Sequence, residues 1–178
     1  MSDNQNVTVM KRLYILLTVL IIVTTTTNAQ YAICGVAFGQ SYDVAENYLT
    51  RKFGKAEMYE HNEICYFNRE YAGIPFEFIF FGFQSDDYNT YFNKCTMGRE
   101  FDNIKTAKIF ERKLIKELCA KYDSIDIYVE KNGYLALEGG QSPINKEKPG
   151  FSVFISSRKN KHIVFLVYGP YNYIKEEL

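Results

Sequence analysis

Residues 34–54 read CGVAFGQSYDVAENYLTRKFG, an amphipathic run between two Phe-Gly pairs. Ser41 suits a helix N-cap, because a serine hydroxyl can accept hydrogen bonds from the amides of the first helical turn. Gly54 suits a helix stop. Between them, apolar residues recur on one helical face, at Val44, Ala45, Tyr48, Leu49 and Phe53. The stretch therefore predicts a helix, and its glycines are interpreted as the ends of structural elements.

Three strand-like runs follow this helix, ICYFN from residue 64, IPFEFIFFGF from residue 74 and YNTYFNKCTMG from residue 88. The short turn-forming segments between them favour antiparallel neighbours over crossover connections. In the middle run, alternation assigns Phe76, Phe78 and Phe80 to one face and Glu77, Ile79 and Phe81 to the other. Such continuous apolarity predicts a strand covered on both faces, or an interface.

The pattern restarts at residue 106 with TAKIFERKLIKELCAKYD. Its apolar residues form one helical stripe, at Ala107, Phe110, Leu114, Leu118 and Tyr122. Four short apolar runs follow, IDIYVE, YLALEGG, FSVFISS and HIVFLVYGP. Each is bounded by turn-forming or charged residues and predicts a strand.

The three runs of the first half align with YLALE, GFSVFI and HIVFLVYG of the second. In this alignment the order helix, strand, strand, strand occurs twice, within about residues 33–103 and 104–174. We expect an α+β fold, formed by a single domain over residues 30–178 and built from two degenerate repeats. Each repeat should form an antiparallel sheet with one helix packed across it, since the sheet is the only cover for that helix. Joining of the two sheets edge to edge is one alternative.

The N-terminal part has the features of a secretory signal peptide. Residues 10–30 read MKRLYILLTVLIIVTTTTNAQ, with a basic start, an apolar core and a small residue, Ala29, before the expected cleavage point. The apolar core is shorter than the roughly 20 residues that span a bilayer. We therefore predict a signal peptide over residues 1–29 and export to the periplasm or cell surface; an uncleaved anchor is the alternative. Lipidation at Cys34 is disfavoured because Ile33 precedes it.

The charge and the aromatic content of the chain indicate what kind of partner to expect. Basic and acidic residues number 21 each, and the exported part stays nearly neutral, so a nucleic-acid partner is not expected. No integral membrane segment is expected after leader removal. The chain has 15 Tyr and 14 Phe but no Trp. Another protein is the expected partner, because tyrosine is frequent at interfaces.

Four tyrosines are the candidate partner-binding residues. They lie in the runs REYAGIPFEF and VYGPYNYI: Tyr71, Tyr168, Tyr171 and Tyr173. Core packing is the competing interpretation of the same residues. A carbohydrate-stacking surface at Tyr88, Tyr91 and Asn93 has weaker support.

All four cysteines, Cys34, Cys65, Cys95 and Cys119, lie beyond the leader. An oxidising compartment would allow two disulfides in any of three pairings. Buried free thiols are the alternative. The spacing does not fit a zinc ribbon.

No catalytic, cofactor-binding or metal-binding residues are predicted. The glycine-containing runs lack the spacing of phosphate-binding loops. His61 and His162 stand apart from any second ligand at metal-binding spacing. The competing functional hypothesis is a small secreted hydrolase, in which folding brings a histidine beside a cysteine or a carboxylate.

The order described for residues 35–54, a helix closed by Phe-Gly ahead of a three-stranded meander, resembles the units of the β-lactamase inhibitor protein family and of small outer-membrane-assembly lipoproteins. It also looks like uncharacterised secreted bacterial proteins. The resemblance implies a non-enzymatic scaffold that binds another protein on a sheet face, and it supplies no catalytic residues. The absence of a usable lipidation motif is a departure from the lipoprotein members.

Overall fold

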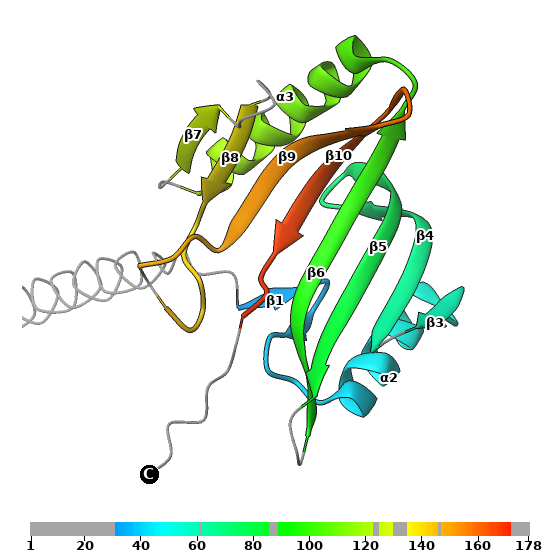
Figure 1. Ribbon diagram of the computed structural model, residues 1–178. Coiled ribbons are helices and arrows are strands. Elements are labelled where there is room, and N and C mark those ends of the chain that lie inside the picture. Colours follow the sequence, from blue (N-terminus) through cyan, green and yellow to red (C-terminus); the bar gives the residue numbers. More distant parts are fainter. Residues whose placement is uncertain are drawn as a thin grey trace, which may run out of the picture.

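The computed structural model describes residues 31–60, 62–85, 89–122, 125–129, 135–145 and 147–171. These residues form an α+β fold with two helices, a small hairpin and one large antiparallel sheet (Figure 1). The elements in chain order are β1 (Ala32–Ile33), β2 (Val36–Ala37), α2 (Tyr42–Phe53), β3 (Met58–Glu60), β4 (Glu63–Tyr71), β5 (Ile74–Ser85), β6 (Thr90–Phe101), α3 (Ile104–Lys121), β7 (Ile125–Val129), β8 (Leu135–Gly139), β9 (Phe151–Arg158) and β10 (Lys161–Tyr168).

The strands pair in the order β3-β4-β5-β6-β10-β9-β8-β7. Each half of the chain contributes a four-stranded meander, and the two meanders meet where β6 pairs with β10. One continuous eight-stranded sheet results, in which the two expected sheets are joined edge to edge. Sequence reasoning missed the short β3, which lies between the first helix and the first predicted strand.

Both predicted helices are present. In α3 the whole expected stripe, from Ala107 to Tyr122, is buried. In α2 only Ala45 and Leu49 are fully buried, whereas Val44 and Tyr48 are 50% and 45% exposed. The expected five-residue stripe of α2 was therefore too wide. Figure 1 places α2 near one end of the sheet, below β4 and β5. This position fits the narrow stripe of buried residues on α2.

The helix ends follow the sequence signals with one difference. Gly54 ends α2 with φ of 85°, a left-handed conformation that glycine adopts without strain. Ser41 occupies the N-cap position of α2, but its side chain makes no capping hydrogen bond. In α3, Asn103 does cap the helix, because its side-chain oxygen accepts a hydrogen bond from the Lys105 amide at 2.7 Å.

A single core lies between the helices and one face of the sheet. It joins residues of α2, such as Leu49, residues of α3, such as Leu114, and sheet residues such as Phe81, Val153 and Leu166. Both helices therefore cover the same face, which we call the helix face. The opposite face, which neither helix covers, is called the open face.

The hairpin formed by β1 and β2 also belongs to the core. Ile33 and Val36 are fully buried, and Phe38 beyond them stacks on Phe92 of β6 with ring centroids 4.6 Å apart. The Gly39 amide donates to the Phe92 carbonyl at 2.7 Å. These contacts hold residues 38 and 39 against β6, and Gly39 lies in the turn that leads to α2, in agreement with the interpretation of the glycines as ends of elements.

The alternation of β5 changes partway along the strand. Phe76 is 2% exposed and its ring contacts Phe110 of α3, whereas Phe78 and Phe80 are partly exposed and contact rings of the open face. The prediction that these three phenylalanines share one face was wrong. In the neighbouring β4, Asn68 has φ of 52° at the same level of the ladder, and this left-handed residue interrupts the extended geometry on which strict alternation depends.

Candidate functional site: an aromatic surface on the open face

Five phenylalanines from four strands form a continuous surface on the open face, here called the aromatic face: Phe67, Phe78, Phe80, Phe154 and Phe165. Ring centroids are 6.0 Å apart for Phe67 and Phe80, 4.8 Å for Phe78 and Phe80, 5.9 Å for Phe78 and Phe165, and 5.2 Å for Phe154 and Phe165. These separations lie in the range of favourable ring pairs. All five side chains are partly exposed, and none belongs to the core on the helix face.

Strand register explains why the rings meet. Phe154 lies opposite Phe165, Phe165 opposite Gly98, Gly98 opposite Phe78, and Phe78 opposite Phe67. One row of side chains thus runs from β9 through β10, β6 and β5 to β4. Directly opposite residues point to the same face, so the row forms a single surface.

Gly98 allows the row to cross β6 without a gap. The Phe78 ring lies over this glycine, in space that a Cβ atom at position 98 would occupy. An aromatic ring that covers a cross-strand glycine shields its exposed backbone and fills the missing side-chain volume. Phe78 can therefore reach Phe165 on the far side of β6.

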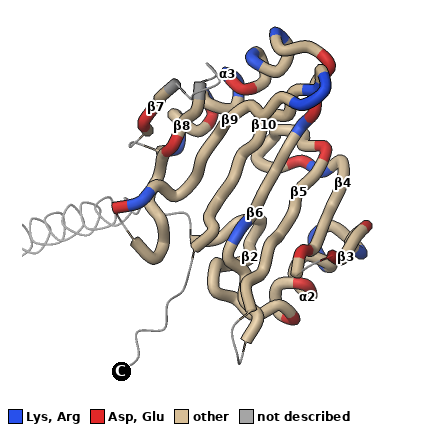
Figure 2. Tube along the Cα trace, in the orientation of Figure 1, with Lys and Arg blue, Asp and Glu red and all other residues tan. Residues whose placement is uncertain are grey.

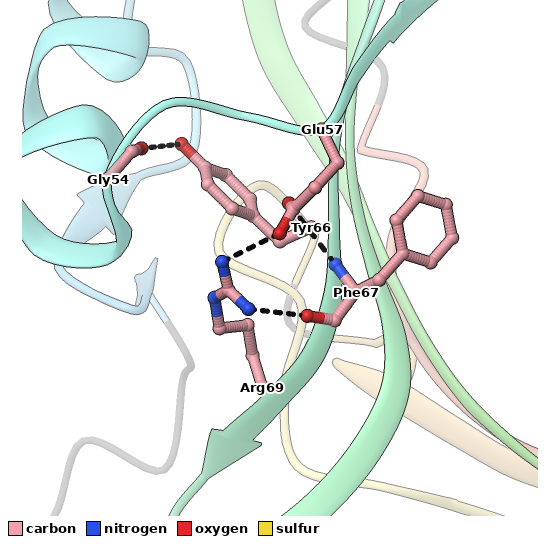
Figure 3. Close-up of polar contacts among 5 residues, drawn as sticks. All are labelled: Gly54, Glu57, Tyr66, Phe67 and Arg69. Atoms are coloured by element: carbon pink, nitrogen blue, oxygen red, sulfur yellow. Dashed lines mark hydrogen bonds and ion pairs between the residues drawn. The ribbon is translucent and has the colours of Figure 1, made fainter.

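The β4 end of the aromatic face is fixed by polar contacts to the backbone of Phe67 (Figure 3). Its amide donates to Glu57 Oε2 at 3.4 Å, and its carbonyl accepts from Arg69 Nη1 at 2.6 Å. Arg69 also pairs with Glu57 at 2.7 Å. Tyr66, the preceding residue, points to the helix face, and its hydroxyl donates to the Gly54 carbonyl at 3.3 Å. The Phe67 ring is thus directed to the open face.

Charged residues surround the aromatic face and do not enter it. Figure 2 shows the middle of β5, β9 and β10 without charged residues, whereas β6 carries one basic residue, Lys94, opposite Gly82. At one end of β6 and β10, Lys161 pairs with Glu100 at 2.9 Å and with Asp102 at 2.5 Å. The hydrogen bond and charge of Lys161 lower the pKa of Asp102. An apolar centre with a charged rim is typical of a protein-interaction surface.

Three of the four predicted tyrosines lie among the described residues, and they do not form an exposed face. Tyr168 is 1% exposed and Tyr171 3% exposed, whereas Tyr71 is partly buried against the same core. Burial raises the pKa of Tyr168 and of Tyr71 above the usual 10.0. Core packing, the competing interpretation, accounts for Tyr168 and Tyr171. Tyr173 lies outside the described residues, as does Tyr88 of the weaker carbohydrate hypothesis.

The Tyr168 hydroxyl lies in a buried polar cluster with the hydroxyls of Tyr71 and Tyr122. The Tyr171 hydroxyl donates to the Gly150 carbonyl. A buried tyrosine needs such a partner for its polar end. These tyrosines therefore join phenylalanines such as Phe81 in the core, whereas the five phenylalanines of the aromatic face lie on the open face.

The four cysteines are free thiols, so the expected disulfides are not formed. Cys34, Cys65 and Cys95 are buried, and Cys119 is exposed. Burial raises the pKa of Cys34 to about 11, an effect that the nearby Lys52 charge partly offsets. Cys65 lies opposite Phe80 in the ladder, and burial followed by the charges of two glutamates raises its pKa to about 11. Neither thiol is prepared for nucleophilic chemistry at neutral pH.

Among the residues that the structure describes, the polar contact of His162 is to a serine. Its Nδ1 lies 2.7 Å from the hydroxyl of Ser157, opposite it in the exposed end of the β9–β10 hairpin. The contact is therefore to a hydroxyl and not to a cysteine or carboxylate. His61 lies outside the described residues. Within the described ranges, no cluster of three or more His, Cys, Asp or Glu side chains is arranged to hold a metal ion.

Comparisons with models of known protein families, with curated proteins and with solved structures found no match. The resemblance described from the sequence therefore stays a prediction. No helix in the described part of the chain is both long and apolar enough to cross a membrane.

Proposed function

We propose that this chain is an exported, non-enzymatic binding protein of the bacterial cell envelope, and that it holds another protein on the aromatic face. The observation that carries the proposal is the continuous surface of five partly exposed phenyl rings, on the sheet face that neither helix covers. Exposed apolar surface of this kind is costly in a soluble protein and usually serves binding. The signal-peptide features of residues 1–29 support export.

The chemistry of the surface favours a protein over a small polar ligand. Phenylalanine rings provide no hydrogen-bonding group. The neighbouring rows carry the hydroxyls of Thr96 and Ser152 on one side and, on the other, the Ser156 hydroxyl and the Glu100 carboxylate, which pairs with Lys161. A sugar needs several polar groups around its stacking ring to fix its orientation. An apolar side-chain cluster of a partner protein needs none, because burial of apolar area provides the affinity.

We further propose that the two halves are degenerate repeats of one unit. In both halves a helix precedes a four-stranded meander, and the last strands of the two meanders, β6 and β10, meet in the middle of the sheet. Phe78 on β5 and Phe154 on β9, the third strand of each meander, both belong to the aromatic face. A paired arrangement of this kind would give the surface its breadth across both halves.

The test is site-specific photo-crosslinking in the producing cells. Incorporation of p-benzoylphenylalanine at Phe154 or Phe165 changes little in shape, because a phenyl ring is already present. The matched control site is Ile109 on α3, whose side chain is 67% exposed. Irradiation should give discrete protein adducts from both open-face positions and none from the control, and mass spectrometry then names the partner.

Two results would oppose the proposal. One is the absence of protein adducts at both open-face positions while the probe protein is present at its normal level in the envelope fraction. The other is the same adduct pattern at Ile109, which would indicate random collision. Recovery of the protein from the cytoplasm alone, with its leader intact, would contradict the export part.

A further inference from the structure

The strand β7 forms an edge of the sheet and has one charged residue, Asp126. It pairs with β8 on one side, and in the described ranges no strand pairs with its other side. Its sequence, IDIYV, is rich in strand-forming residues and has no lysine or proline to discourage pairing. Ile127 is 58% exposed and Tyr128 44% exposed. The outer backbone groups and these side chains together form a template for another strand.

The opposite edge of the sheet is different. There β3 is three residues long, and its sequence Met-Tyr-Glu ends in a charge at Glu60. Glu57, just before this strand, forms the ion pair with Arg69. A short, charged edge is a common protection against unwanted pairing. Of these two edges, the longer β7, with one charge in five residues, is therefore better suited to bind a further strand than β3, with one charge in three.

We propose that two copies of this chain pair through β7, antiparallel, about a two-fold axis perpendicular to the sheet. In the register centred on Ile127, the two Ile127 residues lie opposite each other and all five residues of β7 are paired. Asp126 of each copy then lies opposite Tyr128 of the other. A register centred on Asp126 would instead place two carboxylates opposite each other, next to the Glu138 that adjoins Asp126 in each copy.

The symmetry of this pairing limits the assembly to two copies. A two-fold contact uses the β7 edge of both copies, and the free edges that remain are the two protected β3 strands. The helices of both copies lie on the same side of the joined sheet. Their open faces therefore form one surface, whose central row passes from Tyr128 through Ala136 to Phe154 in each copy. The dimer does not depend on the proposed function of that surface.

The pairing involves five residues per copy, so the buried area falls below the roughly 1,000 Å² expected for a stable interface. The dimer should consequently be reversible and depend on concentration. Ile127→Lys places a charge on both sides of the two-fold axis and should abolish pairing. Ile109→Lys is the matched control, because it makes the same change at a more exposed isoleucine on α3.

Sedimentation velocity of the purified protein, over roughly 5 to 500 µM, measures the association. We expect a shift from monomer towards dimer for the natural chain and for Ile109→Lys, and monomer throughout for Ile127→Lys. Hydrogen exchange gives a second reading, since the backbone amides of residues 125–129 should exchange more slowly as concentration rises. Far-UV circular dichroism establishes that both variants fold.

The proposal is overturned if the natural chain stays monomeric at the highest concentration, or if Ile127→Lys associates as the natural chain does. Assemblies larger than a dimer would overturn the closed two-fold arrangement. Association without slower exchange in residues 125–129 would assign the contact to another surface. Photo-crosslinking from Phe154 to a different protein bears on the proposed function and leaves this result unaffected.

Discussion

Gly98 is a residue at which the absence of a side chain shapes the aromatic face. An alanine there would place its methyl group against the Phe78 ring. Phe78 is partly exposed, so its ring can swing away, and we expect Gly98→Ala to change the free energy of unfolding by no more than about 1.5 kcal/mol. Displacement of the ring should nevertheless reduce photo-crosslinking from Phe165, whose ring it contacts.

Gly82→Ala is the matched control for this variant. It lies on β5, and a Cβ atom there would meet Lys94 Cβ at 3.5 Å, an ordinary contact. Urea unfolding followed by circular dichroism gives the stabilities, and gel analysis of irradiated cells gives the crosslink yields. Equal yields for both glycine variants would show that the position of the Phe78 ring does not matter for binding.

The buried Cys34 thiol predicts a loss of stability in alkali. Its pKa is raised from 9.0 to about 11, chiefly by burial. Between these values an unfolded thiol loses its proton while the folded one keeps it, so the folded state binds more protons and the free energy of unfolding falls as pH rises. The fall attributable to this thiol is at most about 1.4 kcal/mol per pH unit.

Urea unfolding at about pH 8, 9.5 and 10.5 checks this prediction. Cys34→Ala should make the fall in stability between the first two values less steep without removing it, because Cys65 and Cys95, whose pKa values are raised from the same 9.0, still lower stability in this range. The buried tyrosines lower stability at higher pH. A profile identical to that of the natural chain would mean that Cys34 does not remain protonated in the folded state.

The two helices differ in their first turns, although both begin after a residue that favours the N-cap position. Asn103 accepts a hydrogen bond from the Lys105 amide, whereas the Ser41 side chain makes no capping hydrogen bond. Asn103→Ala should therefore cost about 1 kcal/mol of unfolding free energy, and Ser41→Ala less than about 0.5 kcal/mol. Urea titration of the two variants measures both. A larger loss for Ser41→Ala would reverse the assignment of the caps.

Elements with a strong local pattern could be predicted from the sequence, and those that depend on distant partners could not. The spacing of Phe110, Leu114 and Leu118 on α3 fixed both the helix and its buried stripe. On α2 the same rule included Tyr48, but the exposure of that residue depends on how much sheet lies beneath it. The three-residue β3 was missed because its pairing with β4, from Met58 opposite Cys65 onwards, lies outside any local period.

The aromatic face depends on the arrangement of the whole molecule. Phe78 and Phe165 lie far apart in the sequence, and they meet because each lies opposite Gly98. No local pattern contains that register. Nor does any local pattern contain the change of alternation between Phe76 and Phe78, which occurs at the level of Asn68 on the neighbouring strand. The prediction of the four tyrosines rests on the aromatic content of two runs and on the frequency of tyrosine at interfaces, neither of which distinguishes Tyr168 in the core from a ring on the surface. The sequence could therefore predict an aromatic sheet protein, but not which rings are exposed.

The pairing of β6 with β10 predicts that both halves unfold together. It is the strand contact between the two meanders in the described residues, and Leu166 on β10, 1% exposed, lies in the core that contacts both helices. Leu166→Ala should lower the free energy of unfolding by about 2 to 5 kcal/mol. Because the two halves share this core, hydrogen exchange under native conditions should become faster in α2 and α3 by the same factor.

Phe165→Ala is the control on the same strand, where the side chain points to the open face and is already partly exposed. Its truncation creates no enclosed cavity and removes only contacts with the neighbouring exposed rings. We therefore expect a smaller loss of unfolding free energy, about 1 to 2 kcal/mol. Mass-spectrometric hydrogen exchange, with peptides that cover each helix, measures both variants. Faster exchange in α3 while α2 keeps its protection would mean that the halves unfold separately, and the sheet would then be two units in contact instead of one cooperative structure.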